Sequence, residues 1–228
     1  MQEEHNDLPR EEQRTSVLLE NMQQSTAAPT ENSTFPQLDR ALLGKSIFIV
    51  FWLNILTLVP NFLTNERFGA EASSPIHLFG VLLGAAILLL NGLIWVKLSS
   101  QNPHFRPAGI GTIAAGAVMI PAGLLGAETG WYLLFSVVNL VVILYAYYHE
   151  MTACSEILTG VDAVLSANWI KLWKANIVCM IAAFLAPLLT LVSVLLGLTG
   201  LLVISIASLV VAIMRLVYFY RTAMYFRK

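Results

Sequence analysis

Long apolar runs dominate the sequence after residue 40, and they restrict this chain to a membrane protein. The runs cover residues 45–63, 76–98, 108–148 and 175–221. A helix that crosses a bilayer needs about 20 mainly apolar residues, because the hydrocarbon core is about 30 Å thick. Charged residues make up 12% of the chain and the mean hydropathy is +0.71, whereas about 25% of the residues in a soluble domain are charged. We therefore expect an all-α integral membrane protein.

Two of these runs are too long for a single crossing. At 1.5 Å per residue, residues 108–148 would form a helix of about 60 Å and residues 175–221 one of about 70 Å. The glycines of Gly126–Gly130 and of Gly197–Gly200 predict a turn within each run. The sequence therefore predicts a six-transmembrane-helix bundle of three hairpins. The expected helices span about 45–63, 76–98, 108–126, 131–148, 175–196 and 201–221.

The first 39 residues are of a different kind. They are rich in Glu, Gln, Asn, Ser, Thr and Pro and hold no apolar core of the signal-peptide type, so we expect a disordered cytosolic tail over residues 1–39. Asp39 is expected to cap a helix that begins at Arg40. With six crossings, only Arg67 of the 13 Lys and Arg residues falls in an outer segment. The positive-inside rule then places both termini in the cytosol, in a plasma or cytoplasmic membrane.

Three asparagines are the strongest polar groups within the predicted helices. Asn54, Asn91 and Asn139 are each expected to make contacts between helices, and a shared site for a polar solute is the alternative. No Asp or Glu is expected inside a crossing, and Glu150 is assigned to the inner connection. Arg215 is the only charge well inside a crossing, and we expect its long side chain to reach the inner headgroups without a partner.

Small residues mark surfaces where helices can approach closely. Gly80 and Gly84 have the small-xxx-small spacing, and Gly116 lies in the glycine-rich run 108–126. Close backbone packing is the usual role of such residues in membranes. A pore or binding cleft beside Gly116 and Pro121 is the alternative.

The connection 150–174 is polar enough for water and patterned as an amphipathic helix. Its apolar residues fall on one face at 100° per residue, with Trp169 and Trp173 anchoring the next crossing. This face could rest on the membrane surface, on a protein partner or on the bundle itself. Its residues are Leu158, Val161, Leu165, Trp169, Leu172 and Trp173.

No catalytic, cofactor-binding or metal-binding motif is found. His149-Glu150 would begin a zinc-protease motif, but Ala153 stands where the second histidine is required. The other three histidines lie in different segments, and Cys154 and Cys179 are too few for a metal cage. We therefore expect neither an enzyme nor a cofactor.

Two functional classes remain. The net charge of −1 argues against nucleic acid as a partner, because nucleic-acid binders carry basic patches. The expected partners are the lipid bilayer and a protein on the cytosolic side. A non-enzymatic scaffold or regulator of a membrane partner is the main prediction, and a small-solute transporter or permease component is the alternative.

Overall fold

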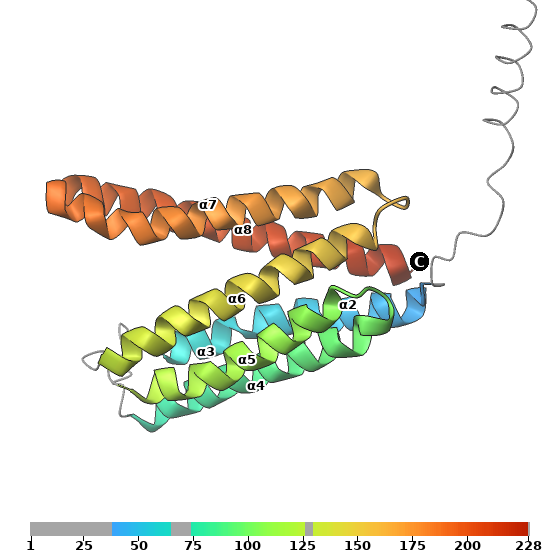
Figure 1. Cartoon of the computed structure of the whole chain (residues 1–228), viewed down its shortest axis with the longest axis horizontal. Coiled ribbons are helices and arrows are strands. Elements are labelled where there is room, and N and C mark those ends of the chain that lie inside the picture. Colours follow the sequence, from blue (N-terminus) through green and yellow to red (C-terminus); the bar gives the residue numbers. More distant parts are fainter. Residues whose placement is uncertain (1–37, 65–73, 126–129, 228) are drawn as a thin grey trace, which may run out of the picture. The chain divides into compact units, whose positions relative to one another are not determined.

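The computed structural model describes residues 38–64, 74–125 and 130–227, apart from the side chains of residues 184 and 186–192. These residues form helices and turns and contain no strand, which confirms the predicted all-helical class. Successive long helices pack against one another in the bundle drawn in Figure 1. The elements are α2 (Arg40–Leu56), α3 (Leu58–Leu63), α4 (Pro75–Lys97), η2 (Leu98–Ser100), α5 (Phe105–Leu124), α6 (Gly130–Glu156), α7 (Ala163–Val192) and α8 (Val194–Arg227).

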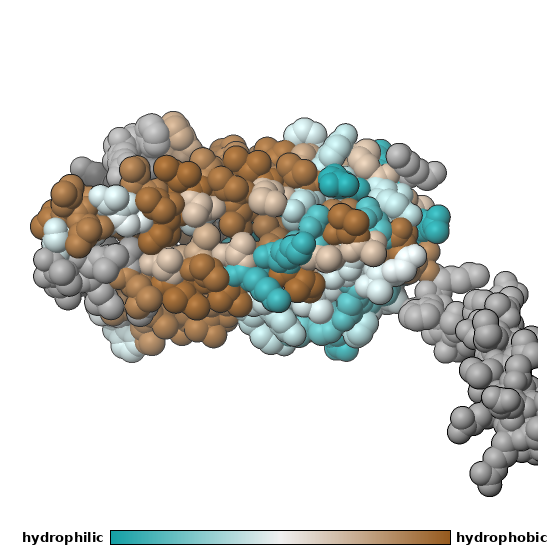
Figure 2. Space-filling model, turned by 90° about the horizontal axis from the view of Figure 1, so that it is seen from above, coloured by the Kyte–Doolittle hydropathy of each residue, from teal (hydrophilic) through white to brown (hydrophobic). Residues whose placement is uncertain are grey.

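Five stretches are long and apolar enough to cross a membrane, judged by length and composition. A sixth crossing requires α7, which is 30 residues long but includes side chains outside the described set, so the count of six stays a prediction. Figure 2 shows one face, on which apolar side chains form a broad area and hydrophilic ones gather toward the end where α2 begins. The five stretches are Arg40–Leu63, Pro75–Ser100, Phe105–Leu124, Gly130–Glu156 and Val194–Arg227.

The first described helix begins where the sequence predicts. Asp39 Oδ1 accepts a hydrogen bond from the Leu42 N–H at 2.9 Å, and α2 starts at Arg40. This bond satisfies one of the free N–H groups of the first turn. Residues 1–37 of the predicted tail lie outside the described residues.

The connection between α6 and α7 differs from the prediction. Helix α6 continues through the expected boundary at Tyr148 as far as Glu156, and α7 begins at Ala163 instead of residue 175. The turn between them contains Gly160 with a positive φ of 84°, a conformation that glycine adopts without steric cost. Asp162 Oδ1 then accepts from the Leu165 N–H at 2.9 Å. A turn and a helix cap therefore divide the expected amphipathic helix.

The break between α7 and α8 lies at Ser193, not at the predicted Gly197–Gly200. The Gly197 N–H donates to the Ser193 carbonyl at 3.0 Å, and Thr199 Oγ1 donates to the Leu195 carbonyl at 2.8 Å. Both bonds belong to a continuing helix. Glycine is common inside membrane helices, so this pair of glycines does not end α8.

Glycines set the distance between α4 and α5. A methyl group added at Gly109 would lie 2.6 Å from the Gly92 carbonyl oxygen, and one added at Gly92 would lie 2.7 Å from the Gly109 carbonyl oxygen. A methyl group at Gly84 would lie 2.7 Å from Met119 Cε, and one at Gly116 would lie 3.2 Å from the Ala85 carbonyl oxygen. The two helices thus meet backbone to backbone.

A third glycine of α4 faces another helix. A methyl group at Gly80 would lie 2.9 Å from Thr64 Cγ2 and 3.0 Å from Leu63 Cβ. The structure therefore places Gly80 against the end of α3, while Gly84 and Gly116 lie between α4 and α5.

The α4–α5 contact leads to a stability prediction. Gly109→Leu is expected to lower the free energy of unfolding by about 1–3 kcal/mol, because the new side chain must push backbone atoms of α4 aside. The free energy is measured by denaturant unfolding of the purified protein in detergent. Gly130→Leu is the control, since a methyl group there meets no described atom within 4 Å. Equal losses in both variants would contradict the close contact.

Candidate functional site

The three predicted asparagines line one cavity of about 390 Å³. Asn54 comes from α2, Asn91 from α4 and Asn139 from α6, and α3, α5 and α8 complete the wall. Pockets for small molecules have volumes of roughly 300–1,000 Å³. The structure therefore brings together polar groups that are far apart in the sequence, in a space large enough for a ligand.

These asparagines do not bond one another among the described residues. Asn54 Nδ2 donates to the Val50 carbonyl of its own helix at 2.8 Å. Asn91 is only 5% exposed, and its Oδ1 and that of Asn139 are buried without a hydrogen-bond partner in the described part of the chain. A buried, unpaired polar group costs about 1–3 kcal/mol. The two amides thus do not act as the interhelical hydrogen bonds that the sequence suggested.

The wall also contains the junction of α2 and α3. Helices α2 and α3 meet at Thr57, which keeps helical dihedrals (φ −61°, ψ −16°) and whose N–H donates to the Leu53 carbonyl at 3.1 Å. Its Oγ1 also donates to the Asn54 carbonyl at 2.6 Å. Pro60 has no N–H to offer the carbonyl of Leu56, four residues earlier. Thr57 and Pro60 both line the cavity.

A buried ion pair lies at the same cavity. Arg215 of α8 donates to Glu150 Oε1 of α6 from Nη2 at 2.6 Å and from Nε at 3.1 Å. The Glu150 side chain is 2% exposed and that of Arg215 13% exposed, and the guanidinium carbon lies 4.0 Å from the centre of the Tyr147 ring. Two predictions are therefore wrong: an acid does lie within a long apolar helix, and Arg215 does have a partner.

The sequence held a signal for this pair. A charge inside an apolar helix is costly enough to require a partner or a water-filled cavity. Ending the fourth crossing at Tyr148 put Glu150 in a loop and so left Arg215 without an acid inside the predicted helices. The actual helix runs on to Glu156, so the carboxylate faces the bundle.

A second cavity, of about 470 Å³, adjoins the first. Met119, Asn139 and Ile143 line both. The second cavity extends to Thr64 and Leu125, which follow the last residues of α3 and α5. Met119 is the flexible side chain between the two spaces, and it fills the hollow left by the missing side chain of Gly84.

The predicted partner face is mostly buried. Leu158 and Trp169 are fully buried, Leu165 is 1% exposed and Leu172 3% exposed, all within the main apolar cluster. Of the alternatives, packing on the bundle is therefore the one that the structure shows for these four residues. Trp173 is half-buried with its ring 5.6 Å from that of Tyr148, and Val161 is 36% exposed.

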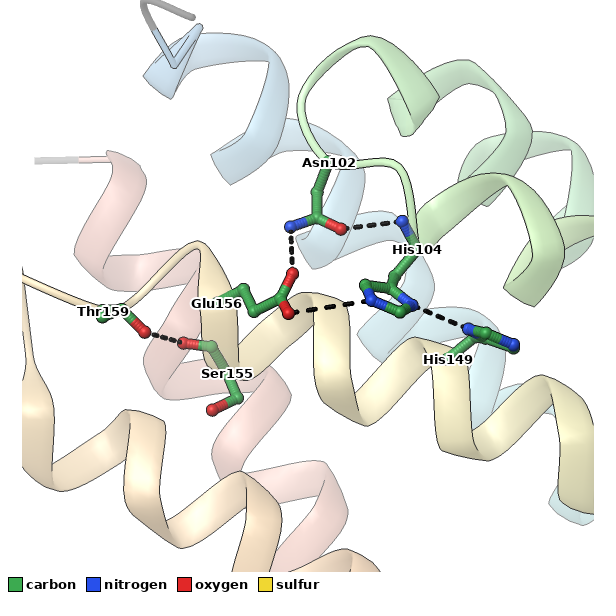
Figure 3. Close-up of polar contacts among 6 residues, drawn as sticks. All are labelled: Asn102, His104, His149, Ser155, Glu156 and Thr159. Carbon is green, nitrogen blue, oxygen red and sulfur yellow. Dashed lines mark hydrogen bonds and ion pairs between the residues drawn. The ribbon is translucent and has the colours of Figure 1, made fainter. Parts of the chain in front are cut away.

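Two histidines that are distant in the sequence meet at the end of the bundle where α2 begins. His104 Nδ1 and His149 Nδ1 are 2.7 Å apart, and His104 Nε2 lies 3.7 Å from Glu156 Oε1 (Figure 3). Asn102 Nδ2 donates to Glu156 Oε2 at 2.8 Å. Within the described residues no three His, Cys, Asp or Glu side chains converge as metal ligands. The cluster ties the loop before α5 to α6.

The chemistry of the first cavity favours binding over catalysis. Amide side chains donate and accept hydrogen bonds but exchange no protons near neutral pH, and the two charged groups hold each other. No protein family, curated protein or solved structure matches this chain. The functional conclusion therefore depends on the geometry of the cavity.

Proposed function

We propose that this protein binds a small polar solute in the cavity between its helices and carries it across a membrane. The observation that carries the proposal is the pair of amides of Asn91 and Asn139, which line one cavity while their buried Oδ1 atoms lack partners in the described chain. An apolar residue at either position would avoid the cost of an unpaired amide. A polar ligand in the cavity would supply the hydrogen bonds that both amides lack.

Other features support transport more than simple binding. Pro60 removes one backbone hydrogen bond from the α2–α3 stretch where it lines the cavity, and a proline is a usual point of bending in a helix. The adjoining cavity reaches the ends of α3 and α5, which gives a solute a path toward one surface. Met119, an unbranched and adaptable side chain, lines both cavities.

The proposed topology has six crossings and both termini in the cytosol. The first half of α2 and the end of α8 lie close together: the Arg227 guanidinium carbon is 4.5 Å from the centre of the Phe48 ring. A 30-residue α7 is about 45 Å long, more than enough to cross. An even number of crossings is what brings two chain ends to one side.

The asparagine pair gives the main test. The double variant Asn91→Leu with Asn139→Leu is expected to lower solute uptake by about tenfold or more yet raise the free energy of unfolding by about 1–3 kcal/mol, because two unpaired buried amides are removed. Uptake is measured in lipid vesicles with radiolabelled urea, erythritol, glycine, lactate and choline. Stability is measured by denaturant unfolding in detergent.

Asn176→Leu is the matched control. Asn176 lies on α7, outside the residues that line the cavity, and its Nδ2 is 3.7 Å from Met180 Sδ. Uptake by this variant is expected to equal that of the unchanged protein. If the double variant takes up every solute as fast as the unchanged protein does, the cavity is not the transport site.

The scaffold role stays a prediction. It was motivated by an apolar face on the α6–α7 connection, and the greater part of that face is buried within the bundle. The transport proposal is supported by a cavity that contains unpaired polar groups, so transport is the function that the geometry supports best.

A further inference from the structure

The charges in the wall of the cavity cancel. Glu150 and Arg215 are the only charged side chains among the described residues that line it. The two are bound to each other through Oε1 at 2.6 and 3.1 Å. The wall therefore offers no net charge to attract an anion or a cation.

A charged ligand would be unfavourable in this cavity whether or not it disrupted the pair. An anion that bound Arg215 would compete with Glu150 and leave the carboxylate, of which 2% is exposed, without a partner. A cation that bound Glu150 would leave Arg215 in the same position. An unpaired buried charge costs several kcal/mol, and an ion that left the pair intact would itself lack a counter-charge. An uncharged ligand incurs neither cost.

The uncharged groups of the wall with hydrogen-bonding capacity left over include two amides. Thr57 Oγ1 and Thr112 Oγ1 are already bonded to carbonyls of their own helices, at 2.6 and 2.8 Å. Asn91 and Asn139 retain acceptors with no partner in the described chain. Rotation about the last side-chain bond turns either the oxygen or the nitrogen of an amide toward a ligand. Such groups suit a ligand that both donates and accepts.

We infer that the solute is small and uncharged and carries hydroxyl or amide groups. This inference depends on the proposed function, because it names the substrate class of the same cavity. The preserved ion pair excludes ionic ligands from the resting site, and the two asparagines supply the hydrogen bonds that hold a neutral one.

The test compares uptake of solutes that differ in charge. Vesicles containing the purified protein are given radiolabelled urea or erythritol as uncharged solutes, glycine as a zwitterion, lactate as an anion and choline as a cation. Uptake of urea or erythritol is expected to exceed that of the Asn91→Leu, Asn139→Leu double variant by about tenfold or more, since one lost hydrogen bond of about 1.4 kcal/mol corresponds to a factor of ten.

A charge-altering variant sharpens this test. Glu150→Gln keeps the shape of the side chain but leaves Arg215 without its counter-charge, so the site gains a net positive charge. This variant is expected to take up lactate about tenfold faster than the unchanged protein. If Glu150→Gln does not fold, the solute comparison on the unchanged protein still decides the inference.

The outcomes separate the two proposals. Uptake of lactate, choline or glycine by the unchanged protein, lost in the asparagine double variant, overturns the uncharged class while the transport proposal stands. Asparagine-dependent uptake of none of the five solutes overturns both. A folded Glu150→Gln variant that still excludes lactate shows that the ion pair does not set the selectivity, and it overturns the inference.

Discussion

Arg215→Met is expected to lower the free energy of unfolding by about 3–5 kcal/mol, because it leaves a buried carboxylate without its partner. Glu150 is 1% exposed and receives two hydrogen bonds from the guanidinium. The described wall of the cavity holds no other cation that could replace Arg215. Denaturant unfolding of the purified protein in detergent measures the loss.

Two further variants identify the cause. The double variant Glu150→Met with Arg215→Met is expected to recover most of the lost stability, since apolar side chains often replace a whole buried ion pair without penalty. Arg221→Met changes an exposed arginine of the same helix, and its effect should stay within about 0.5 kcal/mol. If Arg215→Met were as stable as Arg221→Met, the pair would not be buried as the structure describes it.

Trp169→Ala is expected to cost about 3–5 kcal/mol, the usual range for removing a large buried aromatic side chain. The Trp169 ring is fully buried and lies 5.0 Å from the ring of Phe219 and 5.8 Å from that of Tyr218. Its Nε1 donates to Thr222 Oγ1 at 3.2 Å. This one side chain therefore fixes α7 to α8, and its loss leaves a cavity between them.

Milder and distant substitutions serve as controls for Trp169. Trp169→Phe keeps most of the ring but loses the hydrogen bond, so we expect a loss of about 1 kcal/mol. Trp131→Ala removes a tryptophan that is 65% exposed and should change stability little in detergent. A membrane anchor at position 169, as the amphipathic pattern suggested, would instead make Trp169→Ala as mild as Trp131→Ala.

Several elements follow from local sequence alone. The apolar runs give the positions of α4 and α5 to within a few residues, because the length and hydropathy of a segment suffice to identify a crossing. Asp39 marks the start of α2, because a helix cap is a contact between near neighbours in the chain. Helix ends without so clear a local signal were predicted less well: α6 runs past Tyr148, and α8 continues through Gly197.

The candidate site was only half predictable. The three asparagines could be chosen from sequence, because a strongly polar residue in an apolar run is conspicuous. The sequence could not predict that these asparagines make no hydrogen bonds with one another, because that depends on how far each helix is turned about its axis. The burial of Leu158 and Trp169 depends likewise on the turn at Gly160, which folds the amphipathic face onto the bundle.

The sequence by itself determined that this chain is helical, rich in segments suited to a membrane, and tightly packed at glycines. Only the tertiary structure decided which polar groups meet: Glu150 with Arg215, 65 residues apart, and His104 with His149, 45 residues apart. Hydropathy and helix caps depend on near neighbours in the chain, and the spacing of small residues can be read along it, so a sequence displays all three directly. Contacts between helices depend on the rotation and depth at which whole helices pack, and backbone contacts such as that of Gly92 with Gly109 fix these jointly.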